Sequence, residues 1–96
     1  MTVHVFGEVS IGDLETFLGV FRSAGLDKRR SHGCLGTRVF RPAGEDGRVL
    51  VLLEWPDRAS FEAFTSDPTV GPTMASGGAL GRPVFTVVEQ VAELPA

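Results

Sequence analysis

Several residue types are scarce in this chain of 96 residues, and each scarcity removes a class of protein. The only cysteine is Cys34, so an intrachain disulfide is impossible. No apolar run approaches the roughly 18–20 residues that a membrane-spanning helix needs. The N-terminal stretch "MTVHVFGEVS" lacks the basic start and long apolar segment of a signal peptide. We therefore expect a cytoplasmic protein without a membrane partner.

The chain also has no excess of positive charge. It carries 9 basic and 12 acidic residues, for a net charge of −3, which gives no electrostatic reason to expect nucleic acid as a partner. Its glycines form no phosphate-binding loop of the GxxxxGK or GxGxxG type. His32 and Cys34 are neighbours, but two histidines and one cysteine do not make a zinc pattern, so we expect no metal.

What is present is an ordered pattern of short elements in a chain that is 43% apolar, which predicts one globular domain over 1–96. Ser10 with Asp13 resembles a capping box, Gly25 is a natural helix stop, and Asp57 caps a second helix. The pattern predicts strands over 2–8, 34–41, 48–55 and 83–94, with helices after Ser10 and Asp57. This β-α-β-β-α-β order is typical of an α+β, ferredoxin-like fold, in which the helices cover one face of a four-stranded antiparallel sheet.

One further segment, 70–82, has an open interpretation. Residues 70–82 are too rich in glycine and proline to predict a firm helix; they form either a lid over a ligand or a mobile connection. Asp67-Pro68 before them suggests a short helical turn. The basic cluster at 27–30 is interpreted as the solvated end of the first helix, where positive charge suits the helix dipole.

The strand "RVLVLLEW" is apolar on both of its faces. Val49, Val51, Leu53 and Trp55 share one face, and Leu50, Leu52 and Glu54 share the other. One layer of helices covers only one face of a sheet, so the other would remain exposed as an apolar patch. We therefore expect a homodimer that packs sheet against sheet, the alternative being a monomer with an unusually apolar surface.

The stretches "HGCLGTRVFRP" and "VLVLLEWPDRASFEAFTSDP" resemble the antibiotic biosynthesis monooxygenase (ABM) superfamily, and the resemblance extends over roughly 2–92. It implies a dimeric α/β barrel with a pocket between the helices and the sheet of each subunit. It also implies a cofactor-independent monooxygenase that acts on a small aromatic or polyketide substrate of the phenol, anthrone or quinol type. Trp55 matches the family tryptophan at the end of the third strand.

The resemblance also separates the branches of the family. The haem-degrading members have an asparagine, a tryptophan and a histidine where this chain has Gly7, Phe64 and Met74, so haem degradation is not expected. The polyketide-oxidising members use asparagine and tyrosine side chains, and this sequence contains neither residue. A polyketide cyclase or isomerase, or a non-catalytic dimer that binds a small ligand, is therefore kept as an alternative.

The candidate catalytic residues are His4, Trp55 and Arg38. His4 is the candidate base that ionises a phenol, Trp55 offers a stacking surface and an N–H donor, and Arg38 would hold the developing anion. Each has a structural alternative: a histidine satisfied at the sheet surface, a core anchor, and an arginine paired with a carboxylate. The candidate substrate-binding residues are Phe17, Phe21, Glu54, Phe61, Phe64 and Met74.

Overall fold

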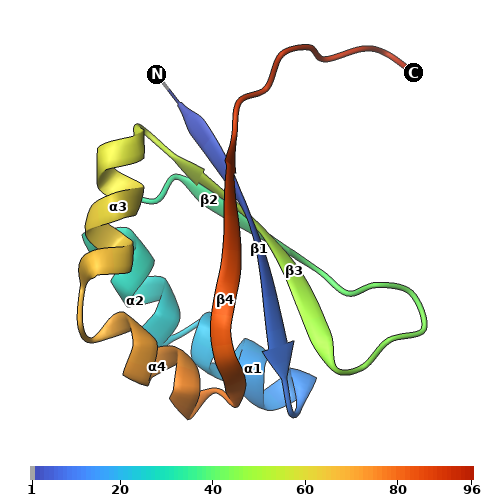
Figure 1. Cartoon of the computed structure of the whole chain (residues 1–96), viewed down its shortest axis with the longest axis vertical. Helices are drawn as coiled ribbons and strands as arrows, with labels where there is room; N and C mark the ends of the chain where they lie inside the picture. Colours follow the sequence, from blue (N-terminus) through green and yellow to red (C-terminus); the bar gives the residue numbers. More distant parts are fainter. Residues whose placement is uncertain (1) are drawn as a thin grey trace.

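A computed structural model describes residues 2–96 (Figure 1). Along this part of the chain the elements are β1 (Val3–Ile11), α1 (Leu14–Phe21), α2 (Ala24–Ser31), β2 (Gly36–Phe40), β3 (Arg48–Trp55), α3 (Arg58–Ser66), α4 (Val70–Ser76) and β4 (Ala79–Val88). None of the helices in residues 2–96 is both long enough and apolar enough to cross a bilayer.

The four strands form one antiparallel sheet in the order β2-β3-β1-β4. The helices gather on one side of this sheet, while the chain after β4 runs out from its end without regular structure (Figure 1). This arrangement confirms the predicted α+β, ferredoxin-like fold. The central pair fixes the register: Val3 lies opposite Trp55, and Val9 lies opposite Val49.

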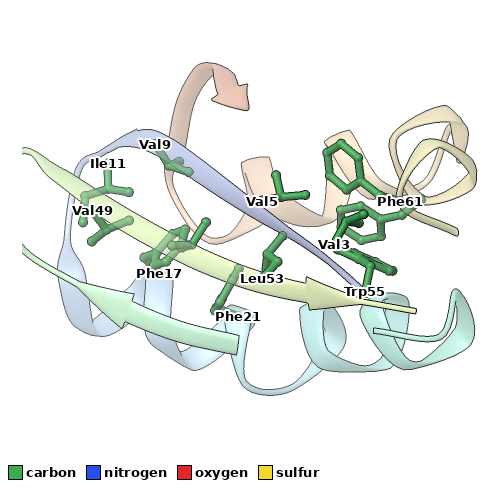
Figure 2. Close-up of a cluster of buried hydrophobic side chains, with 12 residues drawn as sticks. Val3, Val5, Val9, Ile11, Phe17, Phe21, Val49, Leu53, Trp55 and Phe61 are labelled. Carbon is green, nitrogen blue, oxygen red and sulfur yellow. The ribbon is translucent and has the colours of Figure 1, made fainter. Parts of the chain in front are cut away.

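The core occupies the face of the sheet that the helices cover. Residues of β1 and β3 alternate strictly between buried and more exposed positions, as expected for strands with one covered face. Phe17 and Phe21 from α1, and Phe61 and Phe64 from α3, pack onto the buried side chains of these strands. Figure 2 shows Trp55 and Phe61 at one end of this core and Ile11 and Val49 at the other.

The opposite face of the sheet, which we call the open face, is not covered by any helix of residues 2–96. It carries His4, Phe6 and Glu8 from β1, together with Leu50, Leu52, Glu54, Arg38, Phe40 and Val84 from the neighbouring strands. Large apolar side chains remain in solvent there: Phe6 and Phe40 are each 49% exposed and Val84 is 65% exposed. The expectation that one face of an apolar sheet stays uncovered within one chain is therefore met.

The first helical region differs from the prediction. Strand β1 continues through Ser10 and Ile11, because Ser10 pairs with Arg48 and Ile11 with Ala79. Asp13, and not Ser10, is the N-cap, and its carboxylate accepts a hydrogen bond from Thr16 N at 2.8 Å. Gly25 does not end the helical region either: it lies inside a second helix, α2.

The C-terminal part also differs. The segment predicted to lack a firm helix contains α4, because Pro72 sits in its first turn, where a missing N–H costs nothing. Gly77 and Gly78 then close this helix with backbone bonds to Met74 and Ala75. Strand β4 consequently starts at Ala79 and ends at Val88, earlier at both ends than the predicted 83–94.

Candidate active site

A cavity of about 530 Å³ lies between the helices and the covered face of the sheet. We call it the helix–sheet pocket. Its apolar wall comes from all layers of the fold: Leu53 and Phe85 from the sheet, and Phe21, Phe64 and Met74 from the helices. The cavity lies within the range of roughly 300–1,000 Å³ that is typical of small-molecule sites. The arrangement suits a flat, largely apolar ligand.

One charged side chain is buried in the wall of this pocket. Arg29 of α2 is only 5% exposed, and its Nε and Nη1 atoms are buried without a hydrogen-bond partner. The guanidinium carbon lies 3.9 Å from the centre of the Phe21 ring, a cation–π contact. Burial lowers the pKa of Arg29, but a guanidinium remains a cation at every physiological pH.

The pocket wall contains one carboxylate, Asp67, and both of its oxygens are already engaged. His32 Nε2 lies 2.9 Å from Oδ2, while the backbone N–H and hydroxyl of Thr69 donate to Oδ1 at 2.8 and 2.6 Å. These hydrogen bonds hold the pKa of Asp67 well below its usual range, and the one with His32 has the largest effect. Asp67 is therefore an ionised, poorly basic group that ties the end of α2 to the turn before α4.

Trp55, Phe61 and Phe17 lie behind the pocket wall and do not line the cavity. Trp55 is fully buried, and its ring centre is 5.2 Å from that of Phe64, which does line the cavity. The indole Nε1 is buried and has no hydrogen-bond partner. Trp55 thus packs behind the aromatic wall, and its indole N–H has no acceptor there.

The remaining predicted residues lie on the other side of the sheet. His4, Arg38 and Glu54 line a separate hollow on the open face, which also includes Leu52 and Glu89. His4 and Glu54 are opposite each other across the β1–β3 pair, whereas Trp55 points to the covered face. The three predicted catalytic residues are therefore divided by the sheet: His4 and Arg38 share a surface, and neither reaches the helix–sheet pocket.

The charged residues of the pocket, Arg29, Asp67 and Arg82, were absent from the sequence-based prediction. For Arg29 a signal existed. Phe21, Gly25 and Arg29 follow one another at intervals of four, which places them on one face of a helical region. The position of Arg29 in the basic cluster at 27–30 favoured the opposite interpretation, a solvated helix end, and for Arg29 that interpretation is wrong.

Fold and pocket together define a class: a ferredoxin-like α+β protein with a ligand-sized cavity under its helices. The family model for antibiotic biosynthesis monooxygenases matches residues 1–75, and the chain belongs to this family. The superfamily resemblance found in the sequence is thereby confirmed. A comparison with curated protein sequences finds no significant match.

Solved structures support the same fold. The chain is similar to SnoaB, a cofactor-independent oxygenase from Streptomyces nogalater, with a TM-score of 0.77 and 15% identity over 99% of this chain and 98% of that one. It is also similar to a structure described as an antibiotic biosynthesis monooxygenase, with a TM-score of 0.70 and 17% identity over 94% and 99% of the two chains. A protein from Mycobacterium tuberculosis aligns with a TM-score of 0.68 and 13% identity over 97% and 98%. At these identities the likeness establishes the fold alone.

Proposed function

We propose that this protein is a cofactor-independent monooxygenase, and that its substrate is a small aromatic compound of the phenol, anthrone or quinol type. The observation that carries the proposal is the helix–sheet pocket, whose wall joins Phe21, Phe64 and Phe85 with a buried guanidinium. Membership of the family supports the reaction type. The aromatic side chains support a flat substrate, because stacked and edge-on ring contacts are favourable.

The proposed reaction needs only the substrate and dioxygen. Loss of a proton from the phenol or anthrone leaves an electron-rich anion, which transfers electrons to dioxygen. For an anthrone, one oxygen atom bonds to the CH₂ carbon, the O–O bond breaks, and the second oxygen leaves as water with the two hydrogens of that CH₂ group. For a phenol or quinol, the two hydrogens of the water come from a ring C–H and a hydroxyl, and the product is a quinone. The protein's task is then to orient the ring and to stabilise the anion.

The pocket supports anion stabilisation better than general base catalysis. Its wall contains two arginines, Arg29 and Arg82, against the single carboxylate of Asp67. His4, the base expected from the sequence, lies on the open face and lines only the other hollow. Because Asp67 is held in its ionised form by three hydrogen bonds, it is a weak base. We propose that the positive wall favours ionisation of the substrate and that water takes the proton.

We further propose that the open face is the interface of a homodimer, with a second copy of this chain as its occupant. Phe6, Phe40 and Val84 are large apolar side chains that stay about half exposed or more on β1, β2 and β4, and burying them against a second copy would be favourable. An isologous pairing of two such faces is the simplest closed assembly. In this dimer His4, Arg38 and Glu54 would be interface residues.

The proposed activity is tested by oxygen consumption of the purified protein, without added metal or flavin, across a panel of anthrones and hydroquinones.

Two glycine variants test whether the reaction takes place in the helix–sheet pocket. Gly71 lines the pocket and Gly19 does not, yet both lie in helices, and a Cβ added to either would meet nothing within 4 Å. Gly71→Leu should therefore obstruct the pocket, while Gly19→Leu serves as the matched control.

We expect protein-dependent oxygen uptake that Gly71→Leu abolishes and Gly19→Leu preserves. No uptake with any compound, combined with thermal stabilisation by the same compounds, would favour the cyclase or ligand-binding alternative. Equal uptake by both variants would place the chemistry outside the helix–sheet pocket.

A further inference from the structure

We infer that Arg29 is the binding residue for an anionic group of the ligand, and that this pocket selects aromatic compounds that carry a carboxylate. The inference deepens the proposed function, because it uses the same pocket and names the class of compound that enters it. It depends on the surroundings of one guanidinium, and it can hold or fail independently of whether dioxygen is consumed.

The first step is that the Arg29 charge has no partner within the fold. Its Nε and Nη1 atoms carry three of the five guanidinium N–H donors, and both atoms are buried and unbonded. No ion pair in residues 2–96 involves Arg29, whereas Arg41, Arg48 and Arg58 each pair with an exposed carboxylate. A buried, unpaired charge is costly, so its position requires an explanation.

The second step is that the fold makes room for this side chain. A Cβ added to Gly25 would lie 3.3 Å from Arg29 Nη1 and 3.1 Å from the Val20 carbonyl oxygen, so a larger residue there would crowd the guanidinium. On another side the guanidinium rests on Phe21, which itself stacks on Phe17 with ring centres 5.0 Å apart. The guanidinium is thus held by packing at the pocket wall, with its charge left uncompensated.

The third step is that the nearest candidate counter-ion in the wall is not available. Asp67 uses both carboxylate oxygens for His32 and Thr69 and makes no ion pair with Arg29. Arg82, the other cation of the wall, is exposed. The cavity therefore carries a buried positive charge with no internal anion, next to aromatic rings. A carboxylate on a planar ring complements both features: because Nε and Nη1 are closed to solvent, it would accept a charge-assisted hydrogen bond from Nη2, the remaining guanidinium nitrogen.

The test compares two probes with the same ring system, anthraquinone-2-carboxylate and anthraquinone-2-carboxamide, by titration calorimetry at neutral pH. The wild-type protein should bind the carboxylate at least about tenfold more tightly, the effect expected of a charge-assisted hydrogen bond in a dry site. The carboxylate should also raise the melting temperature more than the carboxamide does, a readout that needs no variant.

Arg29→Met removes the charge and keeps an unbranched, apolar side chain. This variant should lose the preference for the carboxylate, bind the carboxamide as before, and melt no lower than the wild type without ligand, because an unpaired buried cation has been removed. Arg29→Lys keeps a cation without the planar fork, and its preference should be intermediate. Arg30→Met and Arg38→Met are the arginine controls and should keep the preference: Arg30 is an exposed neighbour on α2 that does not line the helix–sheet pocket, and Arg38 lies on the open face.

Equal affinity of the wild-type protein for the two probes would overturn the inference, as would a preference that survives Arg29→Met or disappears in Arg30→Met. A large fall in the melting temperature of unliganded Arg29→Met would show a structural role instead. If neither probe binds, the result would contradict both the proposal that this pocket binds aromatic compounds and the inference about Arg29. Selective, Arg29-dependent binding without oxygen uptake would leave the inference standing and contradict the oxygenase proposal alone.

Discussion

The two faces of the sheet are built from the same strands and do different things. Leu52 and Leu53 are neighbours on β3, yet Leu53 is buried under the helices and lines the helix–sheet pocket, while Leu52 faces the hollow on the open face. The covered face is apolar with one buried charge, Arg29, whereas the open face mixes exposed phenylalanines with His4, Arg38 and Glu54. An apolar strand can therefore serve two purposes: it lines an internal pocket on one side and, as we propose, an interface between two copies on the other.

The largest expected effect contrasts these two leucines. Leu53→Ala should lower the free energy of unfolding by about 2–5 kcal/mol, because it leaves a cavity in a packed core. Leu52→Ala should cost well under that amount, and its cost should grow with protein concentration, because Leu52 is only partly buried in one chain and association would bury the rest of it. Urea denaturation of both variants at two protein concentrations measures the contrast. Equal costs that do not depend on concentration would contradict the assignment of the two faces.

A slightly smaller effect is expected at Gly7, on the covered face of β1. A Cβ added there would lie 2.8 Å from Val51 Cγ2 and 2.9 Å from Phe85 Cε1, so one of these side chains must move. Gly7→Ala should destabilise the fold by about 1–3 kcal/mol through overpacking. The control, Gly19→Ala in α1, meets open space and should stabilise by up to about 1 kcal/mol. Thermal unfolding of the two variants measures the difference. An unchanged melting temperature of Gly7→Ala would mean that the packing around Gly7 is looser than described.

The proposed dimer is tested on the open face with Phe6→Asp. A charge placed in the centre of this apolar surface should weaken association at least about tenfold, since central interface residues carry most of the binding energy. The monomer should remain folded, because Phe6 lies outside the core. Analytical ultracentrifugation gives the dissociation constant, with Glu62→Gln on the exposed side of α3 as the control. A wild-type protein that sediments as a monomer at all concentrations would exclude the dimer.

The smallest effect concerns the carboxylate of the pocket wall. The pKa of Asp67 is lower in the folded state than in the unfolded state, so its hydrogen bonds add stability above the unfolded pKa, and this contribution is lost as the pH falls toward the folded value. Asp67→Asn should therefore melt a few degrees below the wild type at neutral pH, with the gap closing in acid. Melting temperatures from pH 7 down to pH 3 provide the check; a gap that widens in acid would reverse the assigned sign.

Much of the fold was predictable because its strongest signals are local. Strand β3 was predicted with its observed bounds, since "RVLVLLEW" is bracketed by turn residues on one side and Pro56-Asp57 on the other. The start of the first helix was predicted wrongly, because Ser10 and Asp13 resemble a capping box locally. The pairing of Ser10 with Arg48, a contact distant in sequence, decides that Ser10 belongs to a strand.

The pocket was predicted only in part for the same reason. Helical spacing pointed to Phe21 and Phe64, and Met74 was a candidate from the segment 70–82; all three line the cavity. Alternation along β3 separated Trp55 from Glu54, but it could not tell which face the helices cover, and His4 was placed with Trp55 although the sheet divides them. The burial of Arg29 depends on the space above Gly25 and on the Phe21 ring, and these tertiary contacts have no fixed sequence signature.

The central claim is that the ligand enters the covered face and not the open one, and the two adjacent leucines report on it directly. The measurement is a methyl NMR titration of the isotope-labelled protein with anthraquinone-2-carboxylate, following the Leu53 and Leu52 signals. We expect the Leu53 methyl signals to shift as ligand is added until the pocket is saturated, while the Leu52 signals do not shift. Shifts confined to Leu52 would place the ligand in the hollow beside His4 and Arg38 and contradict the account.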